Sequence, residues 1–249
     1  MIAVTRGVSP SISECELTHI DRIPIDYGQA VAEHDQYCAL LRSMGCEVVE
    51  LPGDAEYPDG VFIEDTAVVL DDVAVITRPG AESRRGETRA VAEVLSSYRR
   101  LAHVTAPATL DGGDVLVLRN RIYAGESERS NGEGREQLSR MTGREVIAVG
   151  LHGALHLKTA VTRVSEDTLL VNREWVDVAV FADWRLIDAD PREPFGANAM
   201  LVGRTVVYPA EMPHTRARLE AAGLDVRTVP AAELAKAEGG VTCCALLLD

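Results

Sequence analysis

The sequence has no apolar run long enough to span a lipid bilayer, and it does not begin with a basic segment followed by a long apolar stretch. It also lacks low-complexity tracts, while apolar residues make up 46% of the chain. Its 249 residues suffice for one substantial core or for two small domains. We therefore expect a compact, soluble, cytoplasmic globule for which a membrane is not a partner.

Cysteine is scarce, and the five cysteines show neither C-x-x-C spacing nor the density of a disulfide framework. Their odd number also argues against complete pairing. We expect free thiols, of which at least one is available as a working thiolate. They are Cys15, Cys38, Cys46, Cys243 and Cys244.

Positive charge is in short supply, because 25 lysines and arginines face 39 aspartates and glutamates, a formal net charge of −14. Such a charge repels a nucleic-acid backbone or an anionic membrane and attracts a cationic small molecule. We expect no nucleic acid as a partner. Solubility alone explains the acidity equally well.

Apolar strand-like runs recur in pairs, and each pair encloses a short polar turn, which is the signature of a β-hairpin. The pairs are Thr66 to Leu70 with Val73 to Thr77, Val115 to Leu118 with Ile122 to Ala124, Ala160 to Val164 with Thr168 to Asn172, and Met200 to Val202 with Thr205 to Tyr208. A fifth pair forms if Cys243 to Leu248 pairs with Ile2 to Arg6. This pairing would join the two ends of the chain and leave no free sheet edge.

Helical patterns follow most hairpins and end at glycines, as helix C-termini commonly do. We expect helices over Tyr27 to Met44, Arg84 to Tyr98, Asn131 to Thr142 and Pro213 to Ala222, and a strand over Glu47 to Leu51. The hairpins recur every 40 to 50 residues or so, a period typical of propellers and arrays. The chain therefore reads as one domain, residues 1–249, without a linker.

Four segments place unusual polar residues where apolar strands begin or end. They are Asp59-Gly60-Val61-Phe62-Ile63-Glu64-Asp65-Thr66, Leu110-Asp111-Gly112-Gly113-Asp114, Leu155-His156-Leu157-Lys158 and Gly239-Gly240-Val241-Thr242-Cys243-Cys244. Because each segment precedes a strand of a different repeat, a propeller would gather them at one end of its axis. The set contains a candidate nucleophile, a candidate base and several carboxylates, the combination used in covalent catalysis.

In this order and with these flanks, the segments resemble those of dimethylarginine dimethylaminohydrolases, a family of the guanidine-modifying pentein superfamily. The resemblance extends to Ile76-Thr77-Arg78-Pro79-Gly80-Ala81 and Ser83-Arg84-Arg85, and it covers nearly the whole chain. It implies a five-bladed α/β propeller of ββαβ units about a pseudo-fivefold axis. It also implies hydrolysis of N-methylated arginine to citrulline and dimethylamine or methylamine, without a metal or another cofactor.

The resemblance assigns roles to individual residues. It implies that Cys243 is the nucleophile, that His156 is the general acid and base, and that Asp111 is the carboxylate that holds His156 and the guanidinium. It further implies a substrate site in which Asp59, Glu64 and Asp65 hold the cationic end, Arg84 and Arg129 hold the carboxylate, Leu17 lies in a loop above, and Ala237 and Glu238 close the pocket.

The residue types fit this chemistry independently. A guanidinium is a resonance-stabilised cation, so carboxylates must hold it rigidly before its carbon is attacked. Paired hydrogen bonds from its planar N–H groups to Asp65 and Asp111 would be strong and selective. The same carboxylates raise the pKa of a nearby cysteine, so we expect Cys243 to be activated chiefly by the bound cation or by protonated His156.

Simpler interpretations compete for most of these residues. Both cysteines near the C-terminus fit a core role, and strand alternation lets only one face the axis, for which we choose Cys243. His152 and His156 have a metal-like spacing, but Gly153 argues against the helix that a zinc site would need. Asp114 fits the role of Asp111 equally well on spacing. Arg84 and Arg129 fit solvated positions at helix starts, and the segment from Gly7 to Ile20 fits either a mobile lid or an ordinary surface loop.

Two rival functions use the same fold. An arginine deiminase would release ammonia from free arginine, although such enzymes carry an inserted helical segment that this sequence lacks. A non-catalytic pentein would bind a macromolecule, which the charge and the complete Cys/His/acid set oppose. The sequence leaves the oligomeric state open, with a homodimer as the assembly considered.

Overall fold

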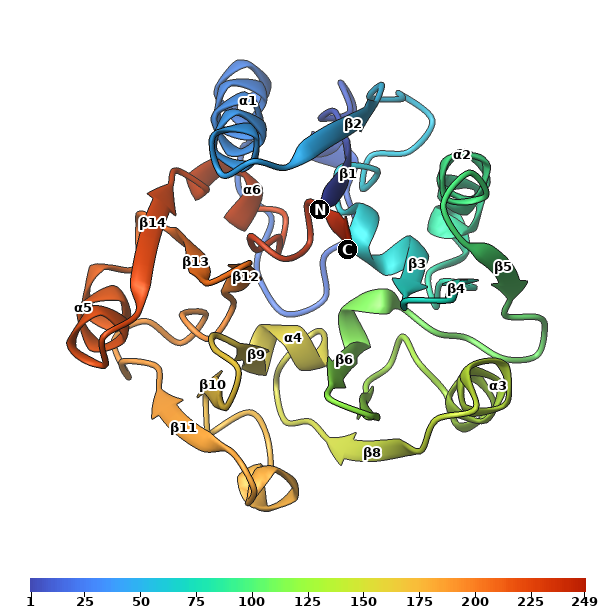
Figure 1. The fold of residues 1–249 in the computed structure, drawn as a ribbon. Coiled ribbons are helices and arrows are strands. Elements are labelled where there is room, and N and C mark those ends of the chain that lie inside the picture. The colour runs from blue at the N-terminus through green and yellow to red at the C-terminus, as the bar shows by residue number, and fades with distance from the viewer.

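The computed structural model describes residues 1–249, which form an α/β propeller of five three-stranded sheets arranged as blades around one axis (Figure 1). In each blade the first strand pairs antiparallel with the second, and the second pairs parallel with the third. The parallel pair requires a crossover connection, which a helix provides in four blades. The predicted five-bladed fold is therefore confirmed.

From the axis outwards, the blades are composed of β15 (Leu246–Leu248), β1 (Ile2–Arg6) and β2 (Glu47–Leu51); β3 (Ala67–Val69), β4 (Val73–Ile76) and β5 (Arg100–His103); β6 (Val115–Leu118), β7 (Arg121–Glu126) and β8 (Val146–Gly150); β9 (Val161–Arg163), β10 (Thr168–Val171) and β11 (Arg185–Asp188); and β12 (Met200–Val202), β13 (Thr205–Pro209) and β14 (Asp225–Val229). The four internal hairpins are those predicted. The outer strands β5, β8, β11 and β14 were not predicted individually.

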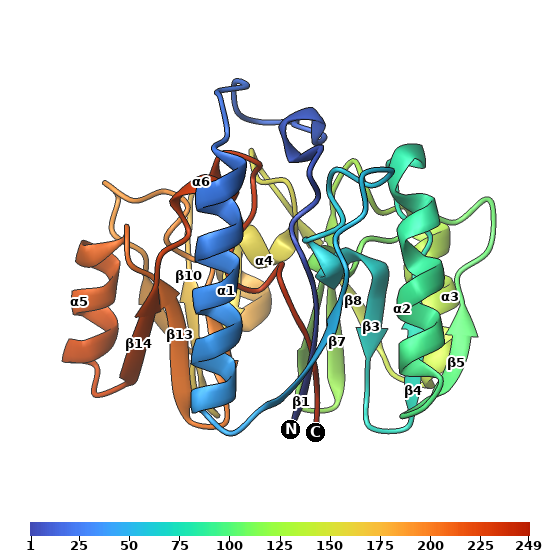
Figure 2. The same ribbon diagram turned by 90° about the horizontal axis from the view of Figure 1, so that it is seen from above.

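The closing blade joins the two ends of the chain. Ile2 pairs with Leu248 and Val4 with Leu246, and Figure 2 shows both termini together at one end of the molecule. Two expectations about this blade are wrong. The last strand begins at Leu246 rather than at Cys243, and the five sheets stay separate, so their outer strands keep a free edge.

Helices cover the outside of the propeller (Figure 1). They are α1 (Tyr27–Ser43), α2 (Thr88–Leu95), α3 (Gly132–Thr142) and α5 (Pro213–Ala221), and no helix is long and apolar enough to cross a membrane. Gly45, Gly143 and Gly223 end three of them with φ values of 86°, 66° and 85°, as glycine does at helix C-termini. The helix expected from Arg84 to Tyr98 is wrong at both ends, because a 3₁₀ segment, η3 (Glu82–Glu87), precedes α2 and Leu95 ends it.

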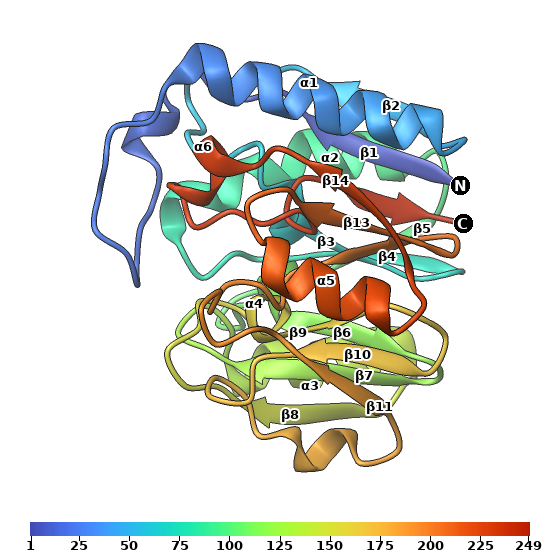
Figure 3. The same ribbon diagram turned by 90° about the vertical axis from the view of Figure 1, so that its left-hand side faces the viewer.

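The propeller axis has two ends, and the end opposite to the chain termini is covered by one segment of the chain. Figure 3 shows that the segment between β1 and α1, with the short η1 (Ile12–Glu14), extends beyond the blades at this end. Figure 1 shows the same blue segment crossing the axis behind the central elements. The end of the axis opposite to the termini is therefore covered by residues of this segment.

Candidate active site

Short helices and turns precede the inner strands and gather at the covered end of the axis. They are η2 (Ile63–Thr66) before β3, η4 (Gly112–Asp114) before β6, α4 (Leu157–Ala160) before β9, and the turn of residues 240–244 before β15. Figure 2 shows α4 at the end of the strands that lies away from the termini. The four polar segments identified in the sequence thus meet at one place, each carried by a different blade.

His156 forms the central pair of this site with Asp111. Its Nε2 lies 3.0 Å from Oδ2 of Asp111, whose other oxygen accepts the N–H of Gly80 at 2.9 Å. Both side chains are buried. The spacing alone did not separate Asp111 from Asp114, and the structure puts the carboxylate of Asp111 on the imidazole.

Asp114 instead organises the backbone around this pair. Its Oδ1 accepts the N–H of Leu157, the residue after His156, at 3.1 Å, and its Oδ2 accepts the hydroxyl of Ser130 at 2.6 Å. The same Ser130 oxygen accepts the N–H of Asp111 at 3.1 Å. Asp114 therefore supports both partners of the pair from behind.

Asp65 supplies a second carboxylate on the other side of the imidazole. Its Oδ1 lies 3.7 Å from Nδ1 of His156 and accepts the N–H of Gly113 at 2.9 Å. Its Oδ2 accepts a hydrogen bond from Nη1 of Arg84 at 2.6 Å. Two carboxylates thus flank one histidine in a buried environment.

The carboxylates control the protonation of the histidine. Burial alone would lower the pKa of His156, but Asp65 and Asp111 outweigh it and raise that pKa to about 9. Burial opposes ionisation of Asp65 as well, yet His156 and Arg84 lower the pKa of Asp65 to about 2. At neutral pH the site therefore holds an imidazolium between carboxylates, a group that can donate a proton.

The two glycines of the Asp111 segment allow this packing. A Cβ at Gly112 would lie 2.0 Å from the carbonyl oxygen of Glu64, and one at Gly113 would lie 2.6 Å from both Oδ1 of Asp65 and Nδ1 of His156. No side chain fits at either place. The glycine pair is thus required by the close approach of η4 to η2 and to His156.

Cys243 lies in a turn and not in a strand, which corrects the premise from which we chose it. Its N–H donates to the carbonyl of Gly240 at 3.1 Å, the N–H of Gly240 points at its Sγ at 3.3 Å, and its own carbonyl accepts the N–H of Glu64 at 3.0 Å. Cys243 is partly exposed, whereas Cys244 is buried and packs in the core. The two thiols do differ in exposure, but the turn causes this and not strand alternation.

The environment of Cys243 keeps its thiol protonated. Burial raises the pKa of Cys243 to about 12, and the charges of Glu64 and Asp65 contribute in the same direction. The hydrogen bond from Gly240 acts in the opposite sense. A thiolate thus requires a positive charge beside the sulfur that offsets both the burial and the neighbouring carboxylates.

Glu64 is held by protein partners on both oxygens. Oε1 lies 2.6 Å from Nζ of Lys158, and Oε2 accepts the hydroxyl of Thr242 at 2.9 Å. The same three residues line a cavity of about 220 Å³ between the inner strands. The structure therefore shows Glu64 linking the segment of His156 to the segment of Cys243, and its predicted contact with a substrate cation stays a prediction.

Arg84 is not the solvated helix-start residue of the simpler interpretation. It is only 4% exposed, and besides Asp65 it binds both oxygens of Glu87, at 3.0 and 2.9 Å, and the carbonyl of Phe62 at 2.9 Å. Glu87 lies three residues further along η3, whereas Asp65 and Phe62 belong to the segment around η2. The predicted contact of Arg84 with a substrate carboxylate stays a prediction.

Hydrogen bonds from two sides hold the segment around Leu17 above the site. Asp59 accepts the N–H of Glu16 with both oxygens, at 3.2 and 3.1 Å. Glu238 accepts the N–H of Thr18 at 2.7 Å on the other side. Leu17 itself is partly buried against the hydrophobic core, so these bonds fix the chain immediately before and after it.

The remaining predicted residues lie around the same segment. Ala237 is buried in the core that Leu17 contacts, Glu238 also accepts the N–H of His19 at 2.7 Å, and Nη2 of Arg129 donates to the hydroxyl of Thr18 at 3.0 Å. Glu238 has a φ of 58°, a conformation that costs a non-glycine residue about 1 to 2 kcal/mol. Its two hydrogen bonds offset this strain.

Three side chains of this site, Asp65, Asp111 and His156, are close enough together to be considered as ligands of a metal ion. Asp65, Asp111 and His156 place one candidate atom each within 4.8 Å of one another, but Asp65 is ion-paired with Arg84. His152 is exposed and lies in a bend before α4, so it cannot share a helical face with His156. The metal-like spacing of the two histidines therefore builds no site.

Known proteins are similar to this chain in both sequence and fold. A family model described as N,N dimethylarginine dimethylhydrolase, eukaryotic, matches residues 22–182. Proteins named N(G),N(G)-dimethylarginine dimethylaminohydrolase are 37% identical over 99% of this chain and 96% of their own length in Streptomyces coelicolor, and 34% identical over 89% of both chains in Pseudomonas aeruginosa. A solved structure of the Pseudomonas aeruginosa protein, a cysteine-to-serine variant in complex with citrulline, has a TM-score of 0.94 at 33% identity and covers 98% of this chain and 97% of its own.

Proposed function

This chain belongs to the dimethylarginine dimethylaminohydrolase family, and from this membership we propose that it hydrolyses the guanidinium of N-methylated arginine to citrulline and dimethylamine or methylamine. The observation that carries the proposal is the buried group of Asp65, His156 and Asp111, which adjoins the Cys243 turn through Glu64. This group combines an available proton with carboxylates that suit a planar cation.

The carboxylates would bind the guanidinium before any bond changes. Asp65 and Asp111 lie on either side of His156 and carry the negative charge that a delocalised cation needs for a rigid, oriented complex. Binding of the cation also lowers the pKa of Cys243, because its positive charge opposes the charges of Glu64 and Asp65, which add to the effect of burial. The substrate thus activates its own nucleophile.

The reaction then proceeds in two steps. As the cation binds, the thiol of Cys243 loses its proton to solvent, and Sγ attacks the guanidinium carbon. The methylated amine departs with a proton from His156, which leaves a covalent thiouronium. The neutral His156 next takes a proton from water, whose oxygen attacks the same carbon and expels the thiolate. The protonated urea product then gives its proton to this thiolate, which yields citrulline and the resting thiol. A pKa of about 9 suits the first step because His156 enters it protonated.

In this proposal Asp59, Glu64 and Asp65 hold the cationic end of the substrate. Arg84 and Arg129 bind its carboxylate. Leu17 lies in the loop above the pocket, which Ala237 and Glu238 close. The acidic surface, with a net charge of −14, favours a cationic small molecule over nucleic acid as partner. A cytoplasmic location and a homodimer belong to the same proposal.

A direct assay tests the function. The purified chain, given asymmetric dimethylarginine, should form citrulline and dimethylamine in equal amounts, whereas free arginine should release far less ammonia. Equal or faster turnover of arginine would assign the chain the deiminase activity instead. No turnover of either compound would contradict both.

Gly113 offers a sharp test of the packing at the site. In Gly113→Ala the new methyl group must displace Asp65 or His156, and a misplacement on the order of 1 Å lowers kcat/KM by about 100-fold. Gly143→Ala is the matched control. It adds strain at a φ of 66° with no atom within 4 Å, so it should lower the free energy of unfolding by about 1 to 2 kcal/mol and leave kcat/KM unchanged. Similar kinetics in both variants would show that the close contact is not required.

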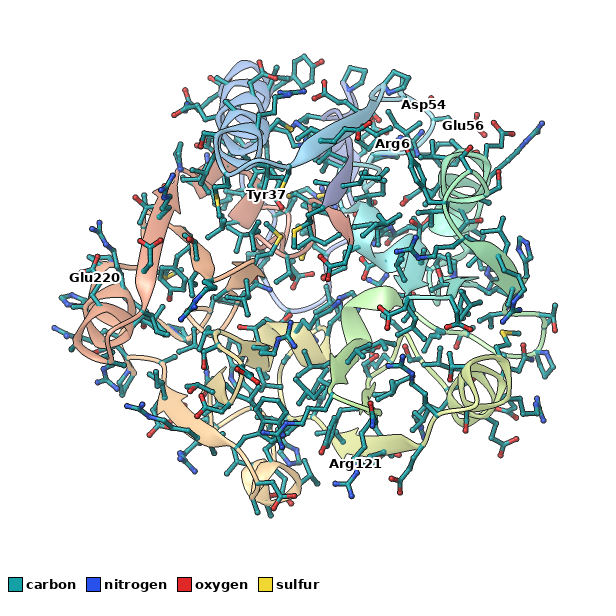
Figure 4. All side chains as sticks on the ribbon, viewed as in Figure 1. Arg6, Tyr37, Asp54, Glu56, Arg121 and Glu220 are labelled. Carbon is teal, nitrogen blue, oxygen red and sulfur yellow. The ribbon has the colours of Figure 1, made fainter.

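The hydrogen bonds of Glu238 predict how the lid affects binding. Glu238→Ala removes the acceptor for two backbone N–H groups, so the Leu17 segment should spend less time closed and KM should rise several-fold while kcat changes less. Glu220→Ala is the control, since Glu220 pairs only with Arg216 on α5, at the outer edge labelled in Figure 4. An unchanged KM in folded Glu238→Ala would remove this contact from substrate binding.

A further inference from the structure

The fifth blade also contributes a polar side chain to the site end of the axis. The four segments already described precede β3, β6, β9 and β15, and the equivalent place before β12 is occupied by Asn198. Its side chain is 7% exposed. A buried amide requires partners for its donors and its acceptor, so these partners indicate its role.

The amide of Asn198 joins the segments of the nucleophile and of the histidine. Its Nδ2 donates to Oγ1 of Thr242 at 2.9 Å and to the carbonyl of Lys158 at 3.0 Å, and its Oδ1 accepts the N–H of Thr242 at 3.1 Å. Thr242 directly precedes Cys243, and Lys158 follows His156 by two residues. One planar side chain therefore holds both segments.

The bonds continue from Thr242 towards the nucleophile. The hydroxyl of Thr242 accepts from Asn198 and donates to Glu64, whose own N–H donates to the carbonyl of Cys243 at 3.0 Å. On the other side of the turn, a Cβ at Gly240 would lie 2.4 Å from Oδ1 of Asn198. The turn that carries the sulfur is thus packed against this amide without space to shift.

Resting on the function proposed above, we infer that Asn198 is a positioning residue that fixes the Cys243 turn relative to His156 through Thr242 and Lys158. The hydrogen bonds of its amide go to Lys158 and Thr242, so it acts on the reaction through the position of the Cys243 turn. Asparagine suits the place because the contacts require two N–H donors and one acceptor in a single plane. Aspartate keeps the shape and the acceptor but presents an oxygen to the carbonyl of Lys158.

Two variants measure this role. Asn198→Ala removes all three hydrogen bonds, and Asn198→Asp removes only the two donated ones. We expect kcat for asymmetric dimethylarginine to fall at least 10-fold in both while KM stays within about threefold, because the carboxylates that bind the cation are unchanged. If Asn198→Ala does not fold, Asn198→Asp carries the test. A kcat within twofold of the wild type in a folded variant would overturn the inference.

Asn172→Ala separates positioning from stability. Asn172 is 8% exposed and also bonds backbone groups, with Nδ2 donating to Pro194 O at 2.9 Å and Oδ1 accepting Glu174 N–H at 3.0 Å, but it lies at the end of β10. The control should lower Tm about as much as Asn198→Ala and keep kcat within twofold. An equal fall of kcat in both variants would show that lost stability alone explains the effect.

The path through Thr242 gives a second signature. On a Thr242→Val background, Asn198→Ala should lower kcat much less than it does in the wild type, since one of its partners is already gone. If Asn198→Ala lowered kcat by the same factor in the wild type and in Thr242→Val, an effect transmitted through Thr242 would be contradicted.

A substrate-independent measurement keeps this inference separate from the proposed function. Alkylation of Cys243 by iodoacetamide at pH 8, followed by peptide mass spectrometry, should be at least fivefold slower in Asn198→Ala and within twofold of the wild type in Asn172→Ala. The reason is that a loosened turn no longer aims the N–H of Gly240 at Sγ. If the wild type fails to form citrulline but alkylation shows this difference, the proposed function fails and the positioning role stands. If the wild type forms citrulline but Cys243 is alkylated at the same rate in Asn198→Ala as in the wild type, the proposed function stands and the positioning role is overturned.

Discussion

Cys243→Ser is expected to reduce the release of citrulline by a factor on the order of 10³ or more. A hydroxyl is far less ionised than a thiol, and even the thiol at this position has its pKa raised to about 12 by burial and by the neighbouring carboxylates. The cation that is expected to activate the sulfur cannot ionise an alcohol to the same extent. Substrate should still bind, because Asp65 and Asp111 are intact, and equilibrium binding of asymmetric dimethylarginine measures this.

Cys244 supplies the matched control. Cys244→Ala removes a buried thiol that packs in the core, so it should lower the free energy of unfolding and retain turnover. An alkylating amidine analogue should modify Cys243 and leave Cys244 free, as judged by peptide mass spectrometry. An adduct on Cys244, or wild-type activity in Cys243→Ser, would mean that the nucleophile is assigned to the wrong residue.

The hairpins could be predicted because their residues are buried in a simple pattern. β4 and β10 are buried at every position, and such strands appear in the sequence as short apolar runs bounded by turn residues. The helices that end at Gly45, Gly143 and Gly223 were equally visible. Local chemistry was sufficient for these elements.

The outer strands could not be recognised in the same way. β5 and β11 each have two exposed and two half-buried residues, so neither the alternation nor the apolar run that marks a strand is present. They are strands because each completes a parallel pair whose other member is distant in sequence. Only the fold as a whole provides that information.

The candidate site likewise contains features that could be predicted from the sequence and features that could not. The polar segments were visible because polar residues beside buried strands are unusual. The contacts among them were not, since Arg84 with Asp65 joins residues on separate elements of one blade and Asn198 with Thr242 joins residues from different blades. A sequence could have suggested Asn198 only through its place before the fifth inner strand, which matches the places of the other four segments.

Asp65→Asn and Asp111→Asn are each expected to lower kcat/KM by roughly 30- to 1000-fold. Each change removes one charge-assisted hydrogen bond to a buried cation, worth roughly 2 to 4 kcal/mol. Asp190→Asn is the control, because Asp190 is 6% exposed and paired with Arg192 and Arg218, away from the site. Its kcat/KM should match that of the wild type.

The titration of His156 provides an independent readout of the same two carboxylates. Both variants should lower the pKa of His156 from about 9, because each removes a negative charge that favours the imidazolium, and NMR of the imidazole measures the change. The folded pKa lies above the ordinary value of 6.5, so this group stabilises the wild type fully below about pH 6.5, and the contribution disappears as pH rises through 9. The free energy of unfolding of Asp111→Asn should therefore change less over that interval than that of the wild type. A wild-type pKa in either variant, together with normal kcat/KM, would remove that aspartate from the site.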